Sequence, residues 1–206
     1  MNPILIAFVG VLMVPLFVAS WRLSLFGLAV QGLLMAWIGY ELHPALDSLG
    51  AWAQMIDLVI VRGLGAPLAL YAVLRAQHAS ARNDVIPPNL MSWTLAIVLV
   101  LVAFRFADML VPGDGDEHSF VAAACAGILL GLLVLSTQTG PFSQMVGALR
   151  IENGIAMFEL GGTHDPAMQI AQTVVLIATI LMFRWYLKTL PRASAAKVSA
   201  VEGMHL

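Results

Sequence analysis

Long apolar runs alternate with short polar connections along the chain. Each run approaches the roughly 20 residues that a helix needs to cross a bilayer, and the runs lack the two-residue alternation of a membrane β-barrel. The connections contain helix-breaking pairs such as His43–Pro44, Pro87–Pro88 and Gly161–Gly162. The pattern predicts an all-α polytopic membrane protein with seven transmembrane helices. The expected helices are Ile4–Ala19, Leu23–Glu41, Trp52–Leu74, Leu90–Val111, Ser119–Leu135, Pro141–Leu160 and Ala167–Leu187.

The composition favours the same class of protein. Of the 206 residues, 60% are hydrophobic and 11% are charged, whereas about 25% of the residues in a soluble domain are charged. The mean hydropathy is +0.89. These values exclude a soluble globular enzyme, a disordered chain and a disulfide-stapled secreted domain. The formal net charge of −2 gives no reason to expect nucleic-acid binding.

The charges of the connections predict an orientation in the membrane. Cytoplasmic loops of membrane proteins carry an excess of Lys and Arg, and with seven helices all the Lys and Arg of the connections fall on one side. We therefore expect the N-terminus outside and the C-terminus in the cytoplasm. Because no Lys or Arg precedes Arg22, we interpret the first run as a retained helix rather than a signal peptide. The cytoplasmic cations are Arg22, Arg75, Arg82, Arg184, Lys188, Arg192 and Lys197, and the opposite side carries Asp47, Asp114, Asp116, Glu117 and Asp165.

Three ionisable residues are expected at the middle of the membrane. With a rise of about 1.5 Å per residue, Glu152 lies about 16 Å beyond Pro141, and Arg150 lies at nearly the same depth. Arg62 lies about 15 Å beyond Trp52. An ionisable residue at a helix centre costs roughly 2.5–3.5 kcal/mol in insertion experiments, and such residues tend to be functional.

These residues predict a polar track through the membrane. Glu152 and Arg62 can pair if their helices are neighbours, and a buried carboxylate beside a cation suits a proton relay. Arg150 points away from Glu152, whereas Glu159 lies on the same helix face and extends the track. The alternative is that buried ion pairs only hold helices together. The candidate proton path consists of Asp57, Arg62, Arg150, Glu152, Glu159 and Gln172.

Other polar residues have simpler interpretations. Arg105 and Asp108 are three residues apart and are expected to form an interfacial charge pair near the outer surface, where snorkelling lowers the cost. Pro67 predicts a kink in its helix. Cys125, the only cysteine, lies in an apolar run and is expected to be an inert thiol. We expect no catalytic residue, no metal site and no cofactor, since the five histidines lack ligand spacing.

Three motifs resemble one family of membrane subunits. The first motif consists of Val134–Leu135–Ser136–Thr137–Gln138, Gln144–Met145–Val146–Gly147 and Ile151–Glu152–Asn153–Gly154. The second is Arg22–Leu23–Ser24 with Gln31. The third is Arg62 with Ala66–Pro67–Leu68 and Tyr71. Taken in their order along the chain, they are similar to the component E family of hydrogenase-4 and formate hydrogenlyase complexes. The Glu–Asn–Gly motif in a seven-helix protein carries most of the resemblance.

The resemblance implies a division of the chain and a role for Glu152. The last three helices of that family are similar to the small three-helix K subunit of complex I, in which glutamates inside the membrane belong to the proton-conducting axis. Glu152 takes the place of the first of these glutamates. The family often has an acid in the following helix, where this chain has Gln172. The expected parts are a four-helix part at 1–111, a K-like part at 112–190 and a cytoplasmic tail at 191–206.

The expected function follows from the resemblance. It implies a non-catalytic subunit of a complex I-like oxidoreductase in the bacterial inner membrane, of the group 4 hydrogenase or formate hydrogenlyase type. The subunit would provide a segment of the proton or ion path. Its partners would be antiporter-like subunits, the subunits that anchor the quinone or hydrogenase module, and the lipid bilayer. The alternatives are a purely structural assembly subunit and an independent ion transporter.

Overall fold

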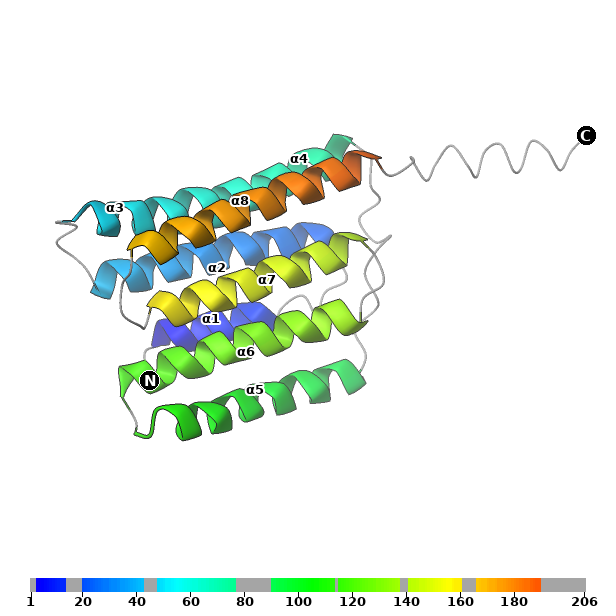
Figure 1. The fold of residues 1–206 in the computed structure, drawn as a ribbon. Helices are drawn as coiled ribbons and strands as arrows, with labels where there is room; N and C mark the ends of the chain where they lie inside the picture. Colours follow the sequence, from blue (N-terminus) through cyan, green and yellow to red (C-terminus); the bar gives the residue numbers. More distant parts are fainter. Residues whose placement is uncertain are drawn as a thin grey trace, which may run out of the picture.

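The chain folds into helices that run side by side (Figure 1). The computed structural model describes residues 3–13, 20–42, 48–76, 90–113, 115–137, 141–160 and 166–189, and these contain helices and no strand. The all-α prediction is thus confirmed for the described residues. The expected tail at 191–206 lies outside them. The elements are α1 (Pro3–Met13), α2 (Trp21–Leu42), α3 (Leu49–Ile56), η2 (Asp57–Gly65), α4 (Ala66–Ala76), α5 (Leu90–Leu110), α6 (Asp116–Thr137), α7 (Pro141–Leu160) and α8 (Pro166–Thr189).

The described helices form seven rods, because α3, η2 and α4 follow one another without a break. Five of the rods are long and apolar enough to cross a membrane, which indicates a membrane protein. They are α2, the α3–η2–α4 rod, α5, α6 and α8. The described part of α1 has 11 residues. In α7 the apolar sequence is interrupted by Arg150, Glu152 and Asn153.

The rods pack as an antiparallel bundle with two open edges. Helix α5 lies at one edge against α6, while α8 and the α3–η2–α4 rod lie at the other (Figure 1). Between them, α6 packs on α1 and α7, and α2 packs on α1, η2 and α7. Large apolar side chains on the outer faces of α5 and α8 are exposed, among them Leu101, Met109, Leu181 and Trp185. Such faces are where a membrane protein meets lipid or other subunits.

Glycines bring α6 and α7 into close contact. A Cβ built on Gly127 would come within 3.2 Å of the Cα of Gly154, and one on Gly131 within 3.0 Å of the carbonyl oxygen of Gly147. Gly127 and Gly131 are spaced as Gly-x-x-x-Gly, the pattern that lets transmembrane helices approach closely. The α6–α7 contact therefore depends on the absence of side chains at these four positions.

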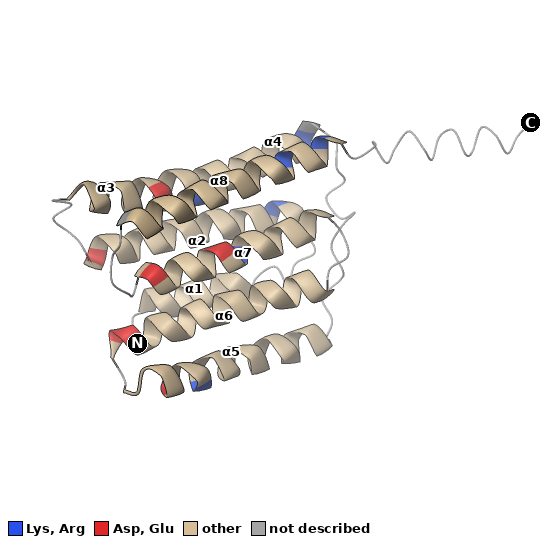
Figure 2. Ribbon diagram, viewed as in Figure 1, with Lys and Arg blue, Asp and Glu red and all other residues tan. Residues whose placement is uncertain are grey.

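Most of the basic and acidic residues near the helix ends lie at opposite ends of the bundle, and Arg105, near the end of α5, is an exception (Figure 2). Arg22 is the second residue of α2, Arg75 lies in the last turn of α4, and Lys188 lies in the last turn of α8. The antiparallel order brings these three positions to one end. Acidic residues lie at the other end, which we call the acidic end, and there Asp116 and Glu117 begin α6. Arg184, also used to predict the orientation, lies one turn before Lys188 in α8. The other charges used in that prediction lie outside the described residues: Arg82, Arg192, Lys197, Asp47, Asp114 and Asp165.

Candidate functional site

The middle of the α3–η2–α4 rod is a π-helix rather than an α-helix. Its backbone bonds span five residues, as the Ala66 N–H donating to the Val61 carbonyl shows. Pro67 follows at once and has no N–H to donate, so the regular α-helical pattern cannot pass through it. The sequence predicted a kink at Pro67, and the structure has a widened turn just before it. π-Helical segments are rare and frequently mark functional sites.

The π-helix brings Asp57 and Arg62 together. In an α-helix, residues five apart point about 140° away from each other. In the wider turn, the Arg62 Nε donates to the Asp57 Oδ2 at 2.7 Å. The side chains are 1% and 14% exposed, so this is a buried ion pair. The second oxygen of Asp57, Oδ1, is buried and has no hydrogen-bond partner among the described residues.

Arg62 also joins the α3–η2–α4 rod to α7 and α2. Its Nη1 donates to the main-chain carbonyl of Glu152 at 3.1 Å and to the Oδ1 of Asn153 at 3.3 Å. The Asn153 Nδ2 in turn donates to the Oε1 of Gln31 at 3.3 Å. The sequence allows the Glu152 carboxylate as a partner of Arg62 if their helices are neighbours. In the structure the counter-ion is Asp57, and Glu152 contributes its backbone oxygen.

This network lies halfway along three rods. Arg62 is thirteen residues after Leu49 and fourteen before Ala76, and Gln31 is ten residues after Trp21 and eleven before Leu42. Asn153 is also far from both ends of α7. Gln31, Arg62 and Asn153 are all buried. Inside the bundle, these groups exchange their hydrogen bonds to water for hydrogen bonds to one another. The exchange lowers the free-energy cost of burying them.

Arg150 occupies a different environment on the other side of α7. Its side chain is fully buried, and its Nη1 donates to the carbonyl oxygen of Leu12 in α1 at 2.9 Å. Its Nε and Nη2 have no hydrogen-bond partner among the described residues. Among the described residues, two arginines are buried: Arg62 pairs with a carboxylate, whereas Arg150 donates to a single carbonyl oxygen.

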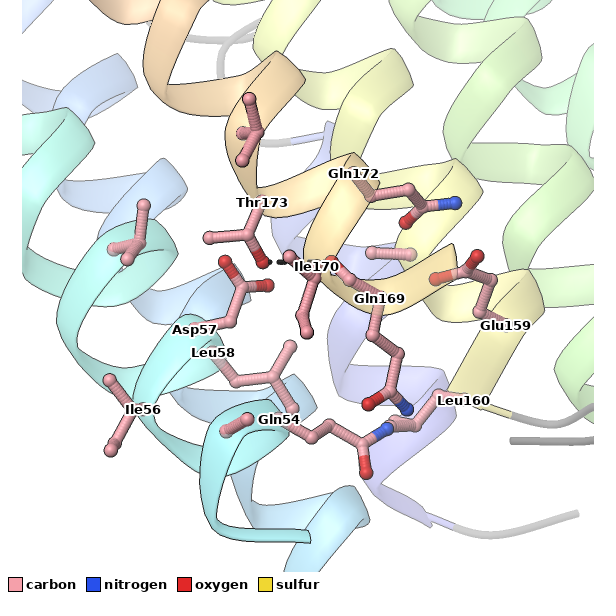
Figure 3. A pocket seen from close by; sticks show the side chains of 14 residues that line it. Gln54, Ile56, Asp57, Leu58, Glu159, Leu160, Gln169, Ile170, Gln172 and Thr173 are labelled. Atoms are coloured by element: carbon pink, nitrogen blue, oxygen red, sulfur yellow. Dashed lines mark hydrogen bonds between the residues drawn. The ribbon is translucent and has the colours of Figure 1, made fainter. Parts of the chain in front are cut away.

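A cavity of about 300 Å³ lies between the α3–η2–α4 rod, α7 and α8 (Figure 3). It unites three residues of the predicted track, Asp57, Glu159 and Gln172. Asp57 and Thr173 face each other across one side, and Glu159 lies on the opposite side (Figure 3). Glu152 does not line the cavity, but Ala156, four residues further along α7, does. Along α7, Glu152 is therefore about 6 Å from the inner limit of the cavity.

Arg105 and Asp108 lie apart from this network, near the end of α5. Their side chains are 3.7 Å apart and face outward, with Arg105 85% exposed. Asp108 makes a shorter contact, 2.9 Å, with the Nε2 of His118 at the start of α6. His118 has no expected role in the sequence, because it lies ten residues from Asp108 and on another helix. The packing of α6 on α5 brings the two side chains together.

Cys125 is half-buried in α6 and packs against apolar clusters. In the part of the chain that the structure describes, no group of three or more His, Cys, Asp and Glu side chains could hold a metal ion.

Comparison with protein-family models, with characterised proteins and with solved structures finds no match to this chain.

Proposed function

We propose that this chain is an integral subunit of a complex I-like membrane assembly and contributes a segment of its proton path. The resemblance of its Glu–Asn–Gly motif to the component E family supports this assignment. The observation that carries it is the buried network of Asp57, Arg62, Asn153 and Gln31 with the backbone of Glu152. Such a network costs free energy inside an apolar bundle, and an ordinary packing contact would not need it.

The proposed arrangement in the membrane has seven spans, with α1 and α7 included. The acidic end faces outward and the end with Arg22, Arg75 and Lys188 faces the cytoplasm of a bacterial inner membrane. The exposed faces of α5 and α8 are the proposed binding surfaces for neighbouring antiporter-like and module-anchoring subunits. In this arrangement the subunit lies between partners rather than at the edge of the assembly.

The proposed path uses two carboxylates with different roles. Asp57, at the cavity, exchanges protons with water, and Glu152, deeper along α7, passes them on toward the neighbouring subunits. Arg62 holds Asp57 in place and is not a relay group, because a guanidinium has no acceptor for a further proton. Gln172 can hold a water molecule but cannot release a proton. The second relay acid of the family would then be supplied by another residue of the assembly.

The test is the substitution Glu152→Gln, which keeps shape and hydrogen bonding but removes the titratable proton. Because Asp57 balances Arg62 and the Glu152 contact is made by its backbone, this change leaves Arg62 paired. We expect normal abundance of the assembly and loss of proton movement in inverted membrane vesicles. Glu117→Gln, the same chemical change at an exposed helix start, serves as the control and should leave both quantities unchanged.

Two outcomes would contradict the proposal. Normal abundance with normal proton movement would remove Glu152 from the path. Loss of the subunit from the membrane would instead favour the structural alternative, in which the buried charges only fix the packing of the helices. That alternative is favoured by one observation, the single bond by which Arg150 ties α7 to Leu12 of α1.

A further inference from the structure

We propose that one face of α8 binds an anionic phospholipid, with an acyl chain along its apolar part and the headgroup phosphate at Arg184 and Lys188. The inference goes beyond the proposed function and requires only that the described helices lie in a membrane. The spacing of the residues on this face, its length and the charges at its end support the assignment.

Exposed side chains follow this face of α8 from the middle of the helix to its end. They recur three or four residues apart, the spacing that aligns residues on a helix surface. The side chains nearer the middle are apolar and those nearer the end are cationic, with a tryptophan between the cations. Tryptophan is enriched at the level of the lipid headgroups. The face, which we call the lipid stripe, consists of Ile177, Leu181, Arg184, Trp185 and Lys188.

The lipid stripe has the length of one leaflet of a bilayer. Ile177 lies at the middle of α8, eleven residues after Pro166 and twelve before Thr189. Lys188 is eleven residues further on, which is about 16 Å at the rise of an α-helix. Half of a hydrocarbon core of about 30 Å has nearly the same thickness. An acyl chain that begins beside Ile177 therefore ends with its phosphate beside the cations, and Arg184 can snorkel to reach it.

The cations at the end of the lipid stripe have no carboxylate partner. Neither α4 nor α8 contains Asp or Glu, and among the described residues Arg184 and Lys188 form no ion pair. Arg75 adds a third exposed cation at the same end (Figure 2), since the residue before it, Leu74, packs in one apolar cluster with Leu187. The balancing negative charge must come from outside these helices. A phosphate suits the site, because Arg binds phosphate with two parallel hydrogen bonds and juxtamembrane cations attract anionic lipids.

A lipid on this stripe leaves part of α8 open to a neighbouring subunit. Val175, Met182 and Tyr186 form a second exposed stripe. Met182 and Tyr186 each follow a member of the lipid stripe by one residue, so they point about 100° away from it. In the proposed assembly, the partner subunit packs on this second stripe and the lipid lies beside it.

The experiment measures lipid binding to the full chain, purified in the assembly to which it belongs. The protein is incubated in detergent with equal amounts of phosphatidylglycerol, which is anionic, and phosphatidylcholine, which is zwitterionic, both with the same acyl chains. After repurification, the retained lipids are quantified by mass spectrometry. The double variant Arg184→Gln with Lys188→Gln is compared with Arg22→Gln, which removes an exposed cation at the same end but on α2.

We expect the parent chain to retain phosphatidylglycerol in preference to phosphatidylcholine. The preference should fall about fivefold for each cation removed, and so about 25-fold in the double variant. Arg22→Gln should lower it less than either single change within the lipid stripe. On the parent chain, the preference should also weaken as the salt concentration rises, because ions screen exposed charges. This second measurement needs no variant and serves if the double variant does not accumulate.

Several outcomes would overturn the lipid site. The parent chain would then retain both lipids equally, or the preference would survive in the double variant or at high salt. An equal loss in Arg22→Gln would show a diffuse attraction of the whole end of the bundle rather than a site on α8. A preference that appears only after the partners are removed would mean that an acidic partner surface covers the cations. These results are independent of proton movement in Glu152→Gln, so this inference and the proposed function can fail separately.

Discussion

Gly32 of α2 lies directly against Gly63 of η2. A Cβ built on Gly32 would come within 2.5 Å of the backbone nitrogen of Gly63 and within 2.6 Å of its Cα. No real Cβ is accommodated at such distances unless a helix moves. The residue before Gly63 is Arg62, so this contact fixes the position of the buried ion pair.

We therefore expect Gly32→Ala to damage the subunit. The clash is with backbone rather than with a flexible side chain, and overpacking of this kind costs about 1–3 kcal/mol or more. The control is Gly10→Ala in α1, where a Cβ meets nothing within 4 Å. Alanine is favoured over glycine in helices by about 1 kcal/mol, so the control should be unchanged or more stable. The measurement is thermal denaturation of the purified subunit, with membrane abundance beside it, and equal behaviour of the two variants would refute the close crossing.

Arg62→Met should prevent the subunit from accumulating. It leaves the Asp57 carboxylate buried without its partner, and breaking a buried ion pair costs about 3–5 kcal/mol. The double variant Asp57→Asn with Arg62→Met removes both charges and should recover part of the abundance. Full recovery is not expected, because Arg62 also donates to Glu152 and Asn153. A double variant that accumulates no better than Arg62→Met would show that the ion pair itself contributes little.

The same substitution at the other buried arginine should have the opposite result. Arg150 has no carboxylate partner among the described residues, so Arg150→Met strands no opposite charge. Replacing buried ions by apolar residues of similar volume is often neutral or stabilising, by up to about 4 kcal/mol. We expect Arg150→Met to accumulate at least as well as the parent chain, measured by immunoblot of membranes. A loss as severe as that of Arg62→Met would indicate an acidic partner for Arg150 elsewhere in the assembly.

The orientation is tested with fused reporters. Reporters placed in the connection after Arg75 and at the C-terminus should both report the cytoplasm, and one placed between α5 and α6 should report the outside. Arg75 and Lys188 lie in the last turns of α4 and α8, at the end of the bundle opposite the acidic end, and each precedes one of the first two fusion points. A periplasmic signal from either of the first two fusions would overturn the seven-span arrangement.

The helices could be predicted from sequence more fully than the site. The run Pro141–Leu160 has the bounds of α7, and Leu90–Val111 differs from α5 by one residue, because apolar length and proline position are local properties. The partner of Arg62 depends on which helices are neighbours. Asp57 is five residues from Arg62, a spacing that places two residues on different faces of an α-helix. Only the π-helix, set by Pro67 and by the crossing with Gly32, brings them together.

The close approach of α6 and α7 has a consequence for biosynthesis. Helix α7 carries Arg150, Glu152 and Asn153, so it partitions poorly from the translocon into lipid as a single segment. Helix α6 is strongly apolar and comes shortly before α7 in the chain. Its Gly127 and Gly131 form the surface on which the α7 backbone packs. We expect the two helices to insert together as a hairpin. A side chain added at Gly131 would then lower the yield of inserted protein before it affected the activity of any finished assembly.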